Sequence, residues 1–293
     1  MKLEFSDSLK SSWPGVRRLS DRSEILSYLE RERSYCAAAI AHLEPDFWRV
    51  SKWFVAIHHE NFALCLISRS MSPSYILTLG NEATLNCLLD SIPLPGEAFI
   101  TCQPRHLDAI EKHYELEWRC LMKRMIAVRE TFSPMREEAI RLRAAQVKKS
   151  NRLCESPSKV FFPRQMGKGV FYGTYRDGRL VAVAGTHLIS PTYGIAYLEN
   201  VLTHPAYRNQ GLAAICASAV VADLFDYCTE VVLNVEPQDL PTVKAYAGLG
   251  FRDDCLLVEA MGRRQSFVGA IITNLRKQFR WNPTYEERTE PNV

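Results

Sequence analysis

The sequence LENVLTHPAYRNQGLAA, residues 198–214, passes from a β-rich run through a short loop into a helix that begins at Gly211. The first N–H groups of a helix have no partners within it, and they lie at the positive end of the helix dipole. Gly211 and Ala213 have little or no side chain to keep an anion away from this backbone, and Asn209 tolerates a positive φ. Arg208 adds a cation. The loop is therefore predicted to bind a phosphate or pyrophosphate group.

A second strand and helix follow this loop. Residues 231–235, VVLNV, form a short apolar run typical of a buried strand, and residues 241–249 have the pattern of a helix that Gly250 ends. Tyr246 lies in the last turn of that helix. The predicted order for residues 198–251 is therefore strand, loop, helix, strand and helix.

The loop resembles the pyrophosphate loop of the GNAT superfamily, the acyl-CoA-dependent N-acyltransferases. Its pattern there is Arg/Gln-x-x-Gly-x-Gly/Ala, and Arg208, Gly211 and Ala213 occupy the three defined positions. The run ENVLTHPAYR, residues 199–208, is similar to the glycine N-acyltransferase-like branch, in which a degenerate N-terminal domain precedes the catalytic one. The resemblance is carried by residues 130–262, and over the first 120 residues it rests on element order.

The second segment resembles the same family. Its pattern there is Asn-x-x-Ala-x-x-x-Tyr-x-x-x-Gly-Phe after a strand, and Tyr246, Gly250 and Phe251 match it. Asp239 stands where the family has Asn, and Thr242 stands where it has Ala. The departure at Asp239 leaves open whether this side chain contacts the cofactor.

The resemblance implies a role for each of these segments. The acyl-pantetheine of the donor would lie between strand residues 201–203 and 233–235 and pair with them like an added strand. Glu199 is the candidate general base for the amine, with a relayed water as the alternative, and Tyr246 is the candidate acid for the departing thiolate. Attack would be direct, without a covalent enzyme intermediate. The implied cofactor-binding residues are Val201, Leu202, Thr203, Arg208, Asn209, Gln210, Gly211, Leu212, Ala213, Ala214, Asn234 and Asp239.

The rest of the chain predicts an α+β fold. Short β-rich runs alternate with turn residues, and Asp177-Gly178 is a strong hairpin signal. Ser133-Pro134 is predicted to begin a helix, because acidic residues follow it and Lys148-Lys149 close the segment. The resemblance implies a mixed, mostly antiparallel GNAT-type sheet flanked by helices. The predicted strands are 53–57, 62–67, 75–79, 98–102, 120–132, 169–176, 179–188, 194–203, 230–235 and 254–260, and the predicted helices are 20–43, 81–91, 104–113, 134–149, 211–227 and 241–249.

Three segments are expected along the chain. Residues 1–125 form an α+β domain of similar type that is not catalytic, and residues 126–262 form the catalytic domain. Residues 263–293 contain a basic amphipathic helix and a tail. Such a helix fits a membrane surface or a partner groove, but we expect its apolar face to dock on the protein's own core.

Composition excludes several classes of protein. The chain of 293 residues has a net charge of +3, which gives no electrostatic footprint for nucleic acid. Its nine cysteines form no CxxC pair, so no zinc or thioredoxin-like site is predicted, and such scattered thiols suit a reducing compartment. The start lacks a signal peptide, and no apolar run approaches 18 residues. A cytoplasmic protein without a metal and without membrane insertion is expected.

Two functions from different classes remain open at this point. The first is an acyltransferase, most simply an N-acetyltransferase, that uses acetyl-CoA or another acyl-CoA and a primary amine or amino-acid-like acceptor. The second is a module that binds or senses acyl-CoA without turnover, for which Tyr246 would be unnecessary. His187 is interpreted as a core or edge histidine and Cys216 as a packing residue. The acceptor, the acyl chain length and the oligomeric state are not specified by the sequence, and Arg152, Lys159 and Arg164 read as surface cations.

Overall fold

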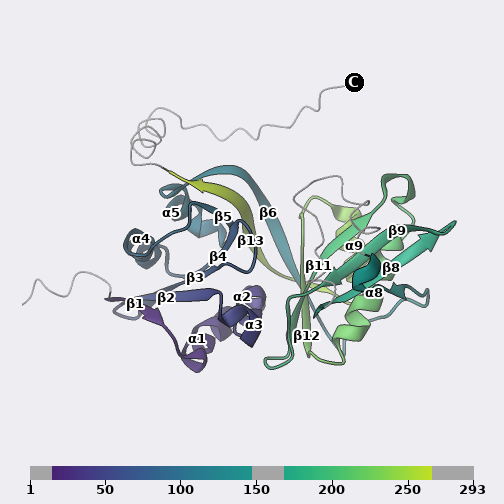
Figure 1. Ribbon diagram of the computed structural model, residues 1–293, viewed down its shortest axis with the longest axis horizontal. Coiled ribbons are helices and arrows are strands. Elements are labelled where there is room, and N and C mark those ends of the chain that lie inside the picture. Colours follow the sequence, from purple (N-terminus) through teal and green to yellow (C-terminus); the bar gives the residue numbers. More distant parts are fainter. Residues whose placement is uncertain (1–14, 147–167, 266–293) are drawn as a thin grey trace, which may run out of the picture.

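One continuous sheet of 13 strands organises residues 15–146 and 168–265, which are the residues that the computed structural model describes (Figure 1). The strand order is β1-β2-β3-β4-β5-β13-β6-β12-β11-β9-β8-β7, with β10 paired to β11. The pairs β4·β5 and β11·β12 are parallel, and the other pairs among the described strands are antiparallel. The predicted mixed, mostly antiparallel α+β fold is confirmed.

The N-terminal half contains a meander followed by two helix–strand units. Its strands are β1 (Gly15–Leu19), β2 (Ser51–His58), β3 (Asn61–Ser68), β4 (Ser74–Gly80), β5 (Glu97–Cys102) and β6 (Tyr114–Val128). Its helices are α1 (Arg22–Leu29), η2 (Glu30–Glu32), α2 (Ala37–Ala41), α3 (Pro45–Trp48), α4 (Glu82–Ser91), η3 (Pro104–His106) and α5 (Leu107–Glu111).

The C-terminal half has the same plan. Its strands are β7 (Ile140–Arg141), β8 (Val170–Arg176), β9 (Arg179–Thr186), β10 (Ile189–Ser190), β11 (Ile195–Thr203), β12 (Glu230–Val235) and β13 (Arg252–Arg264). Its helices are η4 (Ala144–Gln146), η6 (Pro205–Tyr207), α8 (Leu212–Leu224) and α9 (Leu240–Gly248). The hairpin at Asp177-Gly178 is confirmed, and both residues have positive φ angles, 49° and 72°.

The two halves exchange their last strands. The order β4-α4-β5-α5-β6 in the first half corresponds to β11-α8-β12-α9-β13 in the second. β5 pairs with β13 and not with β6, while β12 pairs with β6 and not with β13. The long strands β6 and β13 therefore join the halves into one sheet (Figure 1). This correspondence is topological, and no residue-level repeat accompanies it.

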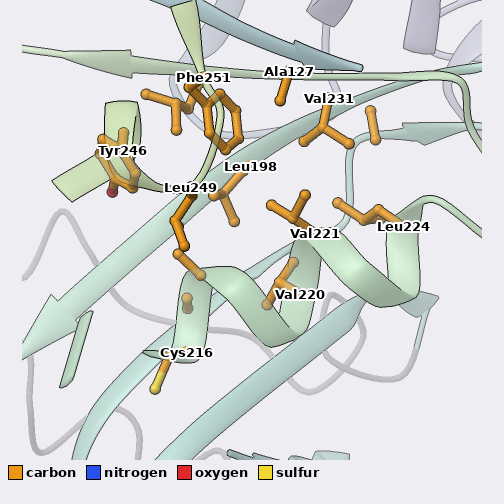
Figure 2. Close-up of a cluster of buried hydrophobic side chains, with 14 of the residues drawn as sticks. Ala127, Leu198, Cys216, Val220, Val221, Leu224, Val231, Tyr246, Leu249 and Phe251 are labelled. Carbon is orange, nitrogen blue, oxygen red and sulfur yellow. The ribbon is translucent and has the colours of Figure 1, made fainter. Parts of the chain in front are cut away.

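Strand alternation divides the C-terminal half of the sheet into two faces. Val231 and Leu233 of β12 point into an apolar cluster with α8 and α9, part of which is drawn in Figure 2. Val232, one residue along, belongs instead to the cluster that contains α1 and α2 of the N-terminal half, together with Ile195. Each side of this region thus has its own core, and the two faces carry different functional side chains.

The predicted helix over residues 134–149 is wrong for the residues that the structure describes, up to Gln146. Its described residues form the two-residue strand β7 and the 3-10 turn η4 instead of an α-helix, and two N–H groups at its start have partners elsewhere. Ser133 N–H donates to the Leu249 carbonyl at 3.0 Å, and Met135 N–H donates to Ser218 Oγ at 2.9 Å. β7 then pairs with β8. Tertiary contacts here outweigh the capping signals.

Other boundaries also differ from the prediction. The helix expected over residues 20–43 is divided into α1, η2 and α2. β6 begins and ends earlier than the predicted 120–132, and β13 extends beyond the predicted 254–260 at both ends. The proposed domain boundary at residues 125 and 126 lies inside β6. The amphipathic helix predicted within residues 263–293 falls beyond Gln265, and Arg152, Lys159 and Arg164 fall between residues 147 and 167, so these predictions lie outside the described residues.

The cysteines of the described residues form no disulfide bond. Eight cysteines are free, and Cys216 is fully buried, where burial raises its thiol pKa to about 11. Within residues 15–146 and 168–265, no helix is long and apolar enough to cross a membrane.

Two buried histidines predict how stability depends on pH. Burial lowers the pKa of His42 and of His106 from 6.5 to about 4, so both are neutral in the folded protein at pH 7. Their folded-state pKa values lie below the unfolded value, so protonation favours unfolding as the pH falls below about 6.5. We expect the free energy of unfolding to decrease by on the order of 3 kcal/mol per histidine between pH 7 and pH 4.

Denaturant titrations across this pH range measure the effect. The matched variant is His106→Gln, which replaces an imidazole bonded to Thr78 Oγ1 and to the Gly80 carbonyl, both at 3.0 Å. His106→Gln should lower stability at pH 7 but make the acid slope shallower. If His106→Gln does not change the slope of unfolding free energy against pH, the prediction that buried His106 contributes to acid destabilisation is wrong.

Candidate active site

The loop before α8 has the form of an anion site. Gly211 is the N-cap of α8 with φ 75° and ψ −1°, Asn209 has φ 63°, and no side chain of the described residues caps the helix. The first α-helical bond runs from Ile215 N–H to the Gly211 carbonyl at 3.0 Å, so the N–H groups before Ile215 have no partner of this kind. A Cβ added at Gly211 would meet nothing within 4 Å. The exposed residues at this opening are Arg208, Asn209, Gln210 and Gly211, whereas Leu212 is buried and Ala213 and Ala214 are half-buried.

The corresponding loop of the N-terminal half is closed. Asn81 Oδ1 accepts a hydrogen bond from Thr84 N–H at 3.1 Å and so caps α4 with the protein's own side chain. Gly80, with φ 108°, is so close to β3 that an added Cβ would lie 2.2 Å from the Phe62 carbonyl oxygen. The two halves therefore share a plan but differ at the helix start.

The hydrogen-bonded pairing between β11 and β12 stops before either strand ends, which leaves a gap in the pairing next to the open loop. The described pairs end at Leu198–Leu233, although β11 continues to Thr203 and β12 to Val235. On its other edge, β11 has an irregular register with β9 between Glu199 and Leu202, and Asn200 has φ 55°. The predicted cofactor-binding residues Val201, Leu202 and Thr203 lie on this irregular end and are half-buried.

In the N-terminal half, side chains bond the matching end of β4. Its described pairs with β5 end at Leu77, and beyond them Tyr35 Oη donates to the Thr78 carbonyl at 2.7 Å. His106 Nε2 lies 3.0 Å from the Gly80 carbonyl oxygen. These buried side chains therefore occupy the backbone acceptors at the end of β4.

These differences predict a single CoA site per chain. Isothermal titration of the full-length protein should give a stoichiometry of one, because Asn81 and His106 close the site of the N-terminal half. Asn81→Ala serves as a control and should leave the stoichiometry unchanged, since Gly80 still approaches Phe62 closely. Binding of two CoA molecules would contradict this prediction.

Glu199 lies on β11 at the start of the irregular segment. Its Oε1 is 2.9 Å from His187 Nδ1, and both side chains are 22% exposed. His187, interpreted from the sequence as a core or edge histidine, therefore contacts the candidate base. Glu199 keeps access to solvent and lies beside the gap between β11 and β12.

Tyr246 lies on α9, on the opposite face of the sheet. Its side chain is 7% exposed and packs edge-on against Phe251, with ring centroids 5.9 Å apart. Figure 2 shows its ring at the margin of the apolar cluster. Burial, followed by the charge of Asp239, raises the pKa of the phenol, which therefore stays protonated at neutral pH. Asp239 itself caps α9 by accepting from Thr242 N–H at 3.2 Å.

A buried polar network beside the gap was not predicted from the sequence. Asn234 Nδ2 donates to Glu259 Oε1 at 2.6 Å, and Tyr197 Oη donates to the same oxygen at 3.3 Å. The guanidinium of Arg124, whose residue is 1% exposed, lies 5.0 Å from the centre of the Tyr197 ring. Burial raises the pKa of the Glu259 carboxyl. A lone acid in the apolar run LLVEAM is the signal that could have indicated Glu259.

Comparisons with known proteins identify a similar family and similar folds. Residues 136–251 match the family model described as acetyltransferase (GNAT) family. A solved Drosophila melanogaster protein is 12% identical with a TM-score of 0.64, covering 84% of this chain and 98% of that one. A GCN5-related N-acetyltransferase from Kribbella flavida is 16% identical with a TM-score of 0.53, covering 78% and 96%.

A GNAT-family protein from Novosphingobium aromaticivorans is 20% identical with a TM-score of 0.50, covering 65% of this chain and 84% of that one. No curated protein matches the sequence. Among the described residues, no group of His, Cys, Asp and Glu side chains is arranged to hold a metal ion.

Proposed function

Starting from the premise that residues 136–251 belong to the GNAT acetyltransferase family, we propose that this protein is an N-acyltransferase. It transfers an acyl group, most simply acetyl, from acyl-CoA to a primary amine. The observation that carries the proposal is the uncapped, exposed start of α8, next to the end of the β11·β12 ladder. In the N-terminal half, built on the same plan, Asn81 caps the helix start, and Tyr35 and His106 bond the end of the matching strand.

The donor is held in two places. Its pyrophosphate lies at the start of α8, where backbone N–H groups and the helix dipole favour an anion and Arg208 adds positive charge. Its pantetheine arm lies along residues 199–203 and takes the position of a strand between β11 and β12. The adenine end then lies toward the exposed loop, and the thioester lies near Glu199.

The reaction needs one proton acceptor and one proton donor. The ammonium form of the amine gives a proton to the Glu199 carboxylate, and the nitrogen lone pair attacks the thioester carbonyl carbon. As the tetrahedral intermediate collapses, the C–S bond breaks and the thiolate takes the proton of the Tyr246 hydroxyl. The nitrogen loses its second proton as the amide forms, and this proton returns to the Tyr246 phenolate through water. The products are the amide and free CoA, and the proton held by Glu199 passes to solvent.

The second candidate is a module that binds acyl-CoA without turnover. The open phosphate loop serves both functions equally. Tyr246 favours the enzyme, because a binding module needs no protonated phenol on the helix beside the thiol position. The proposal of catalysis therefore depends on Tyr246 more than on any other side chain.

Thiol release from acetyl-CoA tests the proposed function. The full-length protein is incubated with acetyl-CoA and a panel of primary amines of different charge, such as phenethylamine, glycine and putrescine. Amine-dependent release of free CoA, with formation of the N-acetyl product by mass spectrometry, is expected for at least one class. Donor binding without release across a broad amine panel would support the binding module instead.

A further inference from the structure

Two side chains of the region between β11 and β12 point to the sheet face opposite α8 and α9. On β12, Val231 and Leu233 face the α8–α9 cluster, and Val232 faces the N-terminal half, so Asn234 lies on the face of Val232. On β11, Leu198 faces the α8–α9 cluster, and Glu199 therefore starts on the other face. The donor's pyrophosphate and Tyr246 belong to the first face, which leaves the second face to the acceptor.

The amide of Asn234 can have one orientation only. Its partner, Glu259 Oε1 at 2.6 Å, accepts hydrogen bonds, so the amide must present Nδ2–H to it. The carbonyl oxygen Oδ1 then points away from Glu259. This oxygen is buried and has no hydrogen-bond partner among the residues that the structure describes.

A buried carbonyl oxygen without a donor is costly, which suggests that a ligand supplies the donor. Glu199 Oε1, on the same face, is likewise buried and has no aligned hydrogen bond within the described residues, although His187 Nδ1 lies 2.9 Å away. In the proposed function, two oxygen acceptors thus border the position of the thioester: Asn234 Oδ1, which has no partner, and Glu199 Oε1, whose one near neighbour is His187 Nδ1.

We propose that Asn234 Oδ1 binds the nucleophilic nitrogen of the acceptor and that Glu259, on the exchanged strand β13, is the positioning residue that fixes the Asn234 amide. This inference rests on the proposed function and adds a specificity-determining residue to it. Once Glu199 has taken one proton, a primary amine has two N–H groups. One donates to Asn234 and the other to Glu199, which aims the lone pair at the thioester. The site therefore selects primary amines over their N-methyl analogues.

Kinetics of the full-length protein test this assignment. With the best amine of the panel and its N-methyl analogue, Asn234→Ala and Glu259→Gln should each raise the amine KM about tenfold, the size expected for the loss of one hydrogen bond. The preference for the primary amine over the N-methyl analogue should decrease by a similar factor. The Kd of acetyl-CoA, measured by calorimetry, should stay within twofold. Glu259→Gln acts by allowing the Asn234 side-chain amide to flip by 180°, because the Gln amide can donate a hydrogen bond as well as accept one.

The matched control is Tyr197→Phe. It removes a hydrogen bond to the same Glu259 oxygen, at 3.3 Å, but leaves Asn234 in place, so the amine KM should not change. If Tyr197→Phe raises KM as much as the other two variants, the network is only structural and the proposal is overturned. A weaker acetyl-CoA Kd with an unchanged amine KM overturns it too, because Asn234 would then serve the donor.

Two further outcomes have a defined meaning. Glu259→Gln is nearly isosteric, so it decides the question if Asn234→Ala does not fold. Wild-type protein that binds acetyl-CoA but releases no thiol with any amine overturns the proposed function. Wild-type turnover without selection against the N-methyl amine overturns this inference alone.

Discussion

Gly211→Glu is expected to weaken CoA binding by at least a hundredfold. The side chain would begin at a position where a Cβ meets nothing within 4 Å, in the mouth of the loop. Its carboxylate can cap the open N–H groups of α8 and so occupy the anion site. At about 4 Å from a phosphate, like charges also repel each other by about 1 kcal/mol in water and about 4 kcal/mol near a protein surface.

Backbone strain must be separated from charge in this experiment. Gly211 has φ 75°, a conformation that any side chain other than Asn or Asp adopts at some cost. Gly211→Gln imposes the same strain with a side chain of the same size and no charge. Calorimetry should therefore show a modest loss for Gly211→Gln and no measurable CoA binding for Gly211→Glu. Equal affinities of the two variants would show that the pyrophosphate does not lie at this helix.

The features that the sequence predicted well depend on local backbone chemistry. The loop before α8 needs small residues and a positive φ at Gly211, and those requirements appear within a few consecutive residues. The Asp177-Gly178 hairpin and the helix capped by Asn81 are local in the same sense. For such features, the residues that form the sequence pattern are the same residues whose backbone adopts the predicted conformation.

The features that the sequence did not predict depend on contacts between distant segments. The segment after Ser133 has good helix signals, but its N–H groups bond Leu249 and Ser218, far along the chain. The exchange of β6 and β13 likewise depends on which of two similar sheet edges each strand joins. Glu259 gains its role only through this exchange, because β13 brings it beside Asn234 of β12. The alternation of apolar and polar residues along one strand does not specify which other strands it pairs with.

Tyr246→Phe is expected to lower kcat on the order of a hundredfold, the usual contribution of a general acid. The hydroxyl is the only group removed. The ring, which is 7% exposed and packed against Phe251, stays in place, so thermal stability should barely change. The loss is not larger because a free thiol has a pKa near 8.5, and its anion is a fair leaving group without assistance.

Comparing the effect of Tyr246→Phe on kcat with its effect on the Kd of acetyl-CoA identifies the role of Tyr246. An interaction made mainly in the transition state lowers kcat while the Kd of acetyl-CoA is unchanged, which calorimetry and steady-state kinetics with a working amine can measure. Tyr227→Phe, at a tyrosine that is 50% exposed on the same half of the protein, is the control and should leave both parameters unchanged. Because burial raises the phenol pKa above its ordinary value of 10, kcat of the wild type should not fall through pH 9 by loss of this proton. An unaltered kcat in Tyr246→Phe would assign the ring to packing alone and make water the source of the thiol proton.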